Sequence, residues 1–81
     1  MKAIVTVTLK PDVLDPQGQA IQKVCASLGH EAIRSVRQGK IFEIELASDD
    51  AAQATALLEE LGDKLLANTV IEDFAVRLQT E

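Results

Sequence analysis

The chain has 81 residues, enough for one small domain over residues 1–81 but too few for two separate cores. Its single Cys and single His exclude a disulfide framework and the usual zinc arrangements, and this usage is typical of a reducing cytosol. A net charge of -5 and 2% aromatic residues argue against nucleic-acid binding, and the short apolar runs predict neither a membrane span nor a signal peptide. We therefore expect a cytoplasmic, single-domain protein.

Residues 2–10 predict a β-strand, because apolar and small polar positions alternate there and many side chains are β-branched. Pro11 ends the strand, since proline cannot donate to a β-ladder. Asp15 then fits a helix N-cap, and Pro16 fits the first helical position. The helix that follows ends at Gly29 and carries an apolar stripe at helical spacing, formed by Ile21, Val24, Cys25 and Leu28.

Residues 33–47 predict a β-hairpin. Gln38 and Gly39 are the expected turn, because glycine tolerates the positive φ of a tight hairpin. The first arm, residues 33–37, alternates poorly. In the second arm, apolar Phe42, Ile44 and Leu46 alternate with Glu43 and Glu45.

A second helix follows the caps offered by Ser48, Asp49 and Asp50. Gly62 interrupts its apolar stripe at a cost of about 1 kcal/mol relative to Ala, and Asn68 fits a left-handed stop. The stripe consists of Ala54, Leu57, Leu58, Leu61 and Leu65. Residues 70–78 alternate again and predict a final strand, in which Glu72 falls on the apolar side as a misfit.

The element order is therefore strand, helix, strand, strand, helix, strand. Right-handed crossovers place both helices on one face of an antiparallel sheet, which predicts a ferredoxin-like βαββαβ two-layer α+β sandwich. The opposite face then has no helix over it, and an apolar patch on such a face is typical of self-association. The residues expected on this bare face are Ile4, Thr6, Thr8, Ile41, Glu43, Glu45, Ile71, Ala75 and Arg77, of which Ile4, Thr6, Ile41, Glu43, Ile71 and Ala75 are the self-association candidates.

No catalytic constellation emerges from the reactive residue types. Cys25 lies within an apolar stripe, which is typical of a core thiol, and His30 follows Gly29 without a motif that ties it to a base or nucleophile. The paired Glu43 and Glu45 on one strand face could perform acid–base chemistry, but a solvated strand face is the commoner explanation for alternating glutamates. One basic cluster remains, and it either contacts an acidic partner or phosphate or protects an edge strand: Arg34, Arg37 and Lys40.

Three strings carry a resemblance to a known family. They are LKPDVLDPQG at residues 9–18, VRQGKIFEI at residues 36–44 and KLLANTVIEDF at residues 64–74. In this order and spacing the chain resembles the PurS family along essentially its whole length. One position departs from the family pattern, since Thr69 stands where the family usually has proline.

The resemblance implies the small subunit of a three-component phosphoribosylformylglycinamidine (FGAM) synthase in purine biosynthesis. In such a complex a PurQ-type glutaminase releases ammonia, and a PurL-type synthetase uses ATP and Mg to convert formylglycinamide ribonucleotide into the amidine. PurS would have no catalytic residue, cofactor or metal of its own. It would form a homodimer or a dimer of dimers, bridge the two larger subunits and assist ammonia transfer.

We expect the exposed, family-like segments to contact the larger subunits. The partner-interface candidates are Asp12, Leu14, Asp15, Gln17, Arg37 and Lys40. The alternative is a stand-alone ACT-like regulatory domain, which would bind a small molecule through glycine-containing loops after the first strand. Here that position holds a proline-flanked helix cap, which favours the PurS interpretation.

Overall fold

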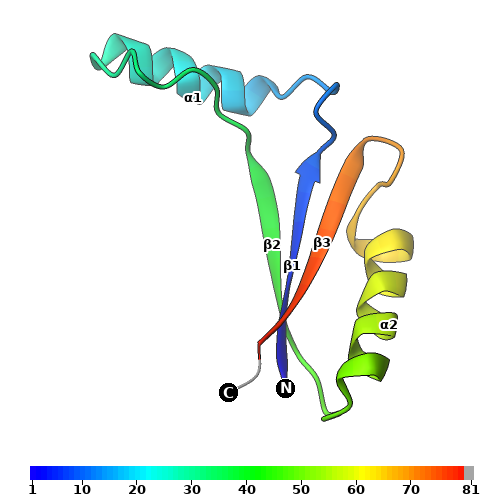
Figure 1. Ribbon diagram of the computed structural model, residues 1–81. Coiled ribbons are helices and arrows are strands. Elements are labelled where there is room, and N and C mark those ends of the chain that lie inside the picture. Colours follow the sequence, from blue (N-terminus) through cyan, green and yellow to red (C-terminus); the bar gives the residue numbers. More distant parts are fainter. Residues whose placement is uncertain (80–81) are drawn as a thin grey trace.

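A computed structural model describes residues 1–79 of the chain. Along the chain its elements are β1 (Lys2–Leu9), α1 (Pro16–Ser27), β2 (Gly39–Glu45), α2 (Ala51–Leu61), the π-helical turn η1 (Gly62–Leu66) and β3 (Glu72–Gln79). The predicted α+β class with an antiparallel sheet is confirmed (Figure 1). No helix among residues 1–79 is long and apolar enough to cross a bilayer.

The three strands form one sheet in the order β2-β1-β3, and both pairings are antiparallel. Register sets the two faces, because residues directly opposite each other share a face. Val5 lies between Phe42 and Val76 on the face that α2 covers, whereas Thr6 lies between Ile41 and Ala75 on the other face. The alternation read from residues 2–10 therefore gives the correct inward and outward sides.

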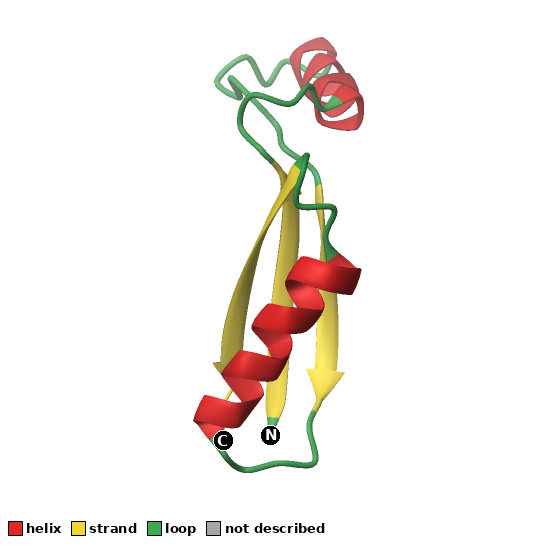
Figure 2. Ribbon diagram, turned by 90° about the vertical axis from the view of Figure 1, so that its right-hand side faces the viewer, coloured by secondary structure: helices red, strands yellow, loops and turns green. Residues whose placement is uncertain are grey.

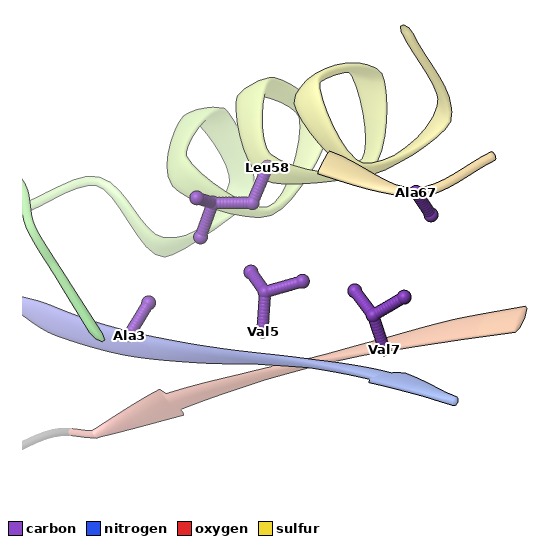
Figure 3. Packing of buried hydrophobic residues seen from close by; sticks show 5 residues of the cluster. All are labelled: Ala3, Val5, Val7, Leu58 and Ala67. Carbon is purple, nitrogen blue, oxygen red and sulfur yellow. The ribbon is translucent and has the colours of Figure 1, made fainter. Parts of the chain in front are cut away.

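The core is small and lies between β1 and α2. Ala3, Val5 and Val7 of β1 are buried beneath Leu58 of α2, and Ala67 closes the cluster beyond the helix (Figure 3). Half-buried apolar residues surround this centre: Phe42, Ile44, Leu46, Leu61, Leu66, Phe74, Val76 and Leu78. Apolar burial therefore holds α2 to the sheet.

Gly62 interrupts the helical stripe because of close packing. A Cβ at this position would collide with the ring of Phe74 on β3. The chain continues from α2 through η1, where the Ala67 amide donates to the Gly62 carbonyl over 3.0 Å. A side chain at Gly62 would force the helix away from the sheet.

Two predicted turns are wrong in detail. The turn predicted at Gln38 and Gly39 is absent, because Gly39 is the first residue of β2. Its φ is not positive, since Gly29 is the one glycine among residues 1–79 with a positive φ, at 91°. Asn68 does not adopt the left-handed conformation. It accepts the Val70 amide through its side chain (3.2 Å) and the Glu72 amide through its carbonyl (2.7 Å), which turns the chain into β3.

Residues 33–37, predicted as the first arm of the hairpin, have no strand structure, so β2 is an edge strand. The sequence also predicted both helices over one face, but only α2 lies there. α1 extends from the end of the sheet toward the opposite side (Figures 1 and 2). The reason is local: hydrogen bonds at the start of α1 fix its direction, and the strand that would have returned it to the sheet is absent.

The molecule is consequently elongated. Its radius of gyration is 16.0 Å, whereas a compact domain of this length has about 12 Å. It exposes 5945 Å² of surface, against about 4,700 Å² for a compact monomer of this mass, an excess of about 1,200 Å².

Candidate functional site

A polar junction joins the start of α1 to the loop before β2. The Asp15 carboxylate accepts the Gly18 amide at 2.9 Å through Oδ1 and the Gln38 amide at 2.7 Å through Oδ2. Asp15 is buried, and so is Gly18, where a Cβ would collide with the carbonyl of Val36. The N-cap predicted at Asp15 is confirmed, but the same carboxylate also ties together two segments that are separated in sequence.

Arg37 anchors the loop that leads into this junction. Its guanidinium Nη2 donates to the carbonyls of Lys10 at 2.8 Å, Val13 at 3.1 Å and Leu9 at 3.4 Å. Charged donors to carbonyl groups are among the stronger hydrogen bonds of a protein. Arg37 therefore fixes residues 10–13, which the sequence alone did not indicate.

The electrostatics of the junction favour an ionised Asp15. The amide hydrogen bonds from Gln38 and Gly18 lower the pKa of Asp15 below its ordinary value, and the Arg37 guanidinium lowers it further. Desolvation acts in the opposite direction but does not reverse the shift. The charged carboxylate is thus the form that the fold stabilises.

The partner-interface candidates divide into two groups. Asp12, Leu14 and Gln17 are exposed on the loop and first turn of α1, and Leu14 leaves 64% of its surface accessible. Asp15 and Arg37 hold this loop in place instead of presenting free side chains. The Lys40 ammonium lies 3.8 Å from the Glu72 carboxylate. The same carboxylate accepts the Asn68 amide at 2.7 Å, so Glu72, the predicted misfit, has two polar partners at the start of β3.

The bare face of the sheet is a second candidate surface. Register places Ile4 between Glu43 of β2 and Arg77 of β3, and the next row has Thr6 between Ile41 and Ala75. Ile41 is 64% exposed, and Ile71 is exposed in the turn before β3. Five of the self-association candidates therefore lie on one face of the sheet, namely Ile4, Thr6, Ile41, Glu43 and Ala75, whereas Ile71 lies in the turn outside the paired strands.

The reactive residue types are dispersed. Cys25 is half-buried on α1, and His30 is exposed in the loop that follows this helix. Among residues 1–79 no group of three His, Cys, Asp or Glu side chains could hold a metal ion. A shallow hollow of about 310 Å³ near the junction is lined by Thr8, Leu9, Pro11 and Arg37, and it contains no nucleophile and base in contact.

Residues 2–80 match the family model described as PurS, phosphoribosylformylglycinamidine (FGAM) synthase. The chain is 45% identical over 80 residues to the phosphoribosylformylglycinamidine synthase subunit PurS of Mycobacterium leprae, covering 99% of this chain and 98% of the relative.

Solved structures agree with this match. The PurS structure of Methanocaldococcus jannaschii, a subunit of formylglycinamide ribonucleotide amidotransferase, superposes with a TM-score of 0.88 at 32% identity and covers 99% of this chain and 96% of that chain. A chain in the PurLQS structure of Thermotoga maritima gives a TM-score of 0.85 at 26% identity, covering 94% and 93%. This chain belongs to the PurS family of FGAM synthase subunits, which act in purine biosynthesis.

Proposed function

We propose that the chain is a non-catalytic subunit that bridges a PurL-type synthetase and a PurQ-type glutaminase and assists ammonia transfer between them. In this role it works as a homodimer or dimer of dimers, while ATP and Mg are bound by the synthetase. Support comes from the full-length similarity to a chain of the Thermotoga maritima PurLQS structure.

The observation that carries the proposal is the rigid, exposed loop at residues 11–14. Arg37 and Asp15 fix its backbone, yet Asp12 and Leu14 face solvent. A preorganised loop loses less conformational entropy on binding than a mobile one does. An exposed leucine held in this way suits an apolar contact with a larger subunit.

A synthase assay tests the bridging role. PurL-type and PurQ-type proteins are assayed with and without this chain, once with glutamine and once with high ammonium chloride as the nitrogen source. We expect the chain to be required with glutamine and much less so with ammonium chloride, because coupling matters only when ammonia must travel between sites. Equal dependence on both nitrogen sources would contradict ammonia coupling, and no dependence would contradict the subunit role.

Matched variants locate the contact. Leu14→Asp should lower glutamine-dependent synthesis by about tenfold, since it places a charge in an apolar contact. Leu65→Asp changes a similarly exposed leucine on η1, outside the loop, and should leave synthesis near the wild-type rate. Equal losses in the two variants would exclude the loop as the specific contact.

A further inference from the structure

Two charged residues lie on the otherwise apolar face of the sheet that α2 covers. Register places Lys40 opposite Val7 and Glu72 opposite Leu9, in neighbouring rows at the end of the sheet from which α1 leaves. Every other strand residue on this face is apolar. Charged side chains are uncommon on such a face unless a polar group faces them.

The two charges border an open hollow of about 260 Å³. The hollow is open because α2 stops short of this end of the sheet and α1 turns away from it (Figure 2). Val7 and Leu9 contribute apolar atoms to its lining, and Gln17 and Gln38 contribute polar ones. Pockets for drug-sized ligands commonly have about 300–1,000 Å³, so this hollow suits a smaller metabolite.

Lys40 and Glu72 lie close together without forming a hydrogen bond. Their charged atoms are 3.8 Å apart, beyond the roughly 3.2 Å reach of an N–H···O hydrogen bond. The other carboxylate oxygen of Glu72 already accepts the Asn68 amide at 2.7 Å, and the Lys40 ammonium lies 5.9 Å from the centre of the Phe42 ring. One carboxylate oxygen and the ammonium are therefore both placed to bind a ligand.

We infer that this hollow binds a free α-amino acid as a zwitterion, and that the carboxamide side chain of glutamine fits it best. One carbon atom carries both charges of an α-amino acid, so the two can lie side by side with the carboxylate over Lys40 and the ammonium over Glu72. A simple anion would meet the Glu72 carboxylate, and a simple cation would meet the Lys40 ammonium. The inference concerns binding by this chain itself and does not depend on the bridging role.

The rest of the lining selects the ligand's side chain. Gln17 and Gln38 carry carboxamides, which donate and accept hydrogen bonds and so match the carboxamide of a bound glutamine. The apolar atoms of Val7 and Leu9 suit its methylene groups. Asp15 contributes no free oxygen, because its two oxygens accept the Gly18 and Gln38 amides. A charged side chain would bring a third charge that this lining does not balance.

Analogues of glutamine test the recognition of both charges. NMR titrations of the full chain are followed at the backbone amides of Gln17, Gln38 and Lys40, and L-glutamine should give saturable shifts at millimolar or lower concentrations. Glutaramate lacks the α-ammonium and L-glutaminamide lacks the carboxylate, so each should bind at least about tenfold more weakly. L-Norvaline keeps both charges but lacks the carboxamide, and its binding should be about threefold to tenfold weaker.

Two variants assign the binding to the hollow. Lys40→Gln and Glu72→Gln each remove one charge, and the carboxamide in Glu72→Gln can still accept the Asn68 amide. Each should weaken the binding of L-glutamine by at least about tenfold. Lys64→Gln and Glu60→Gln are the matched controls, because they make the same changes in an exposed ion pair outside the hollow and should leave the binding unchanged.

Combining a variant with an analogue makes the test specific. Glutaramate has no ammonium for Glu72 to bind, so Glu72→Gln should weaken the binding of L-glutamine but not that of glutaramate. The inference would be overturned by a lack of saturable glutamine binding, by equal binding of L-glutamine and glutaramate, or by equal effects of the hollow and control variants. The synthase assay with the PurL-type and PurQ-type proteins tests the subunit role separately.

Discussion

The two helices are held by different forces. α2 is held by apolar burial, with Leu58 packed on Val5 and Val7, whereas the start of α1 is held by hydrogen bonds that the Asp15 carboxylate accepts, and the apolar stripe of α1 is largely exposed. An isolated helix of 12 residues is marginal in water, so α1 is expected to be the less stable of the two helices. One half of the molecule is therefore held by apolar burial and the other by polar contacts.

The largest effect is expected from removing the centre of the core. Leu58→Ala should lower the free energy of unfolding by about 3 kcal/mol, because it leaves a cavity over β1. Leu57→Ala is the matched control: Leu57 is 46% exposed, and its loss should cost less than about 1 kcal/mol. Urea denaturation measures both, and equal costs would contradict the asymmetric burial of α2.

Gly62→Ala should destabilise the α2 half by about 1–3 kcal/mol, although alanine is the better helix former. The added Cβ collides with the Phe74 ring. In a Phe74→Leu background the same substitution should cost less, which a double-mutant cycle by urea denaturation measures. An unchanged cost in that background would show that the ring is not the cause.

Asp15→Asn should loosen α1 while leaving the core intact. Asparagine still caps a helix but loses the charge and one of the two amide hydrogen bonds that join Gly18 to Gln38. Asp50→Asn is the matched control, because Asp50 caps α2 without a link to another segment. Hydrogen exchange should accelerate in α1 and at Gln38 in Asp15→Asn but not in Asp50→Asn. Acceleration at these positions in both variants would contradict the role of Asp15 in joining the two segments.

Urea denaturation over a series of pH values tests whether the charged form of Asp15 stabilises the fold. The pKa of Asp15 in the folded chain lies below its ordinary value of 3.8. Its stabilising contribution is therefore fully present above the unfolded pKa and is lost as the pH falls through the folded pKa. The difference in unfolding free energy between wild type and Asp15→Asn should be constant above about pH 5 and shrink below about pH 4. A difference that grows on acidification would show that the pKa of Asp15 is raised, and not lowered, in the folded chain.

The smallest effect is expected at the exposed ion pair between Lys10 and Asp73, whose charged atoms lie 2.8 Å apart. Lys10→Ala should change the free energy of unfolding by at most about 0.5 kcal/mol, because solvent screens the pair. Urea denaturation at low and high salt provides the measurement. A loss of unfolding free energy comparable to that of Leu58→Ala would contradict the conclusion that apolar burial, and not surface ion pairs, stabilises the fold.

The sequence by itself determined the local elements and the faces they present. Period-two alternation identified β1 and β3, and the Asp15 and Pro16 pair identified the start of α1, because these signals depend on neighbouring residues. The same alternation identified the bare face, since opposite residues in the register share a side. Three sequence strings, at residues 9–18, 36–44 and 64–74, carried the family resemblance, which the comparisons confirmed.

Only the tertiary structure decided where α1 lies and what Gly18, Arg37 and Gly62 do. Each of these roles depends on groups distant in the chain: the Val36 carbonyl, the carbonyls of residues 9, 10 and 13, and the Phe74 ring. Residues 33–37 carry strand formers but remain a loop, because a strand forms only where a neighbour supplies hydrogen-bond partners. Periodicity encodes which side of an element is apolar, whereas the packing of distant segments determines what covers it.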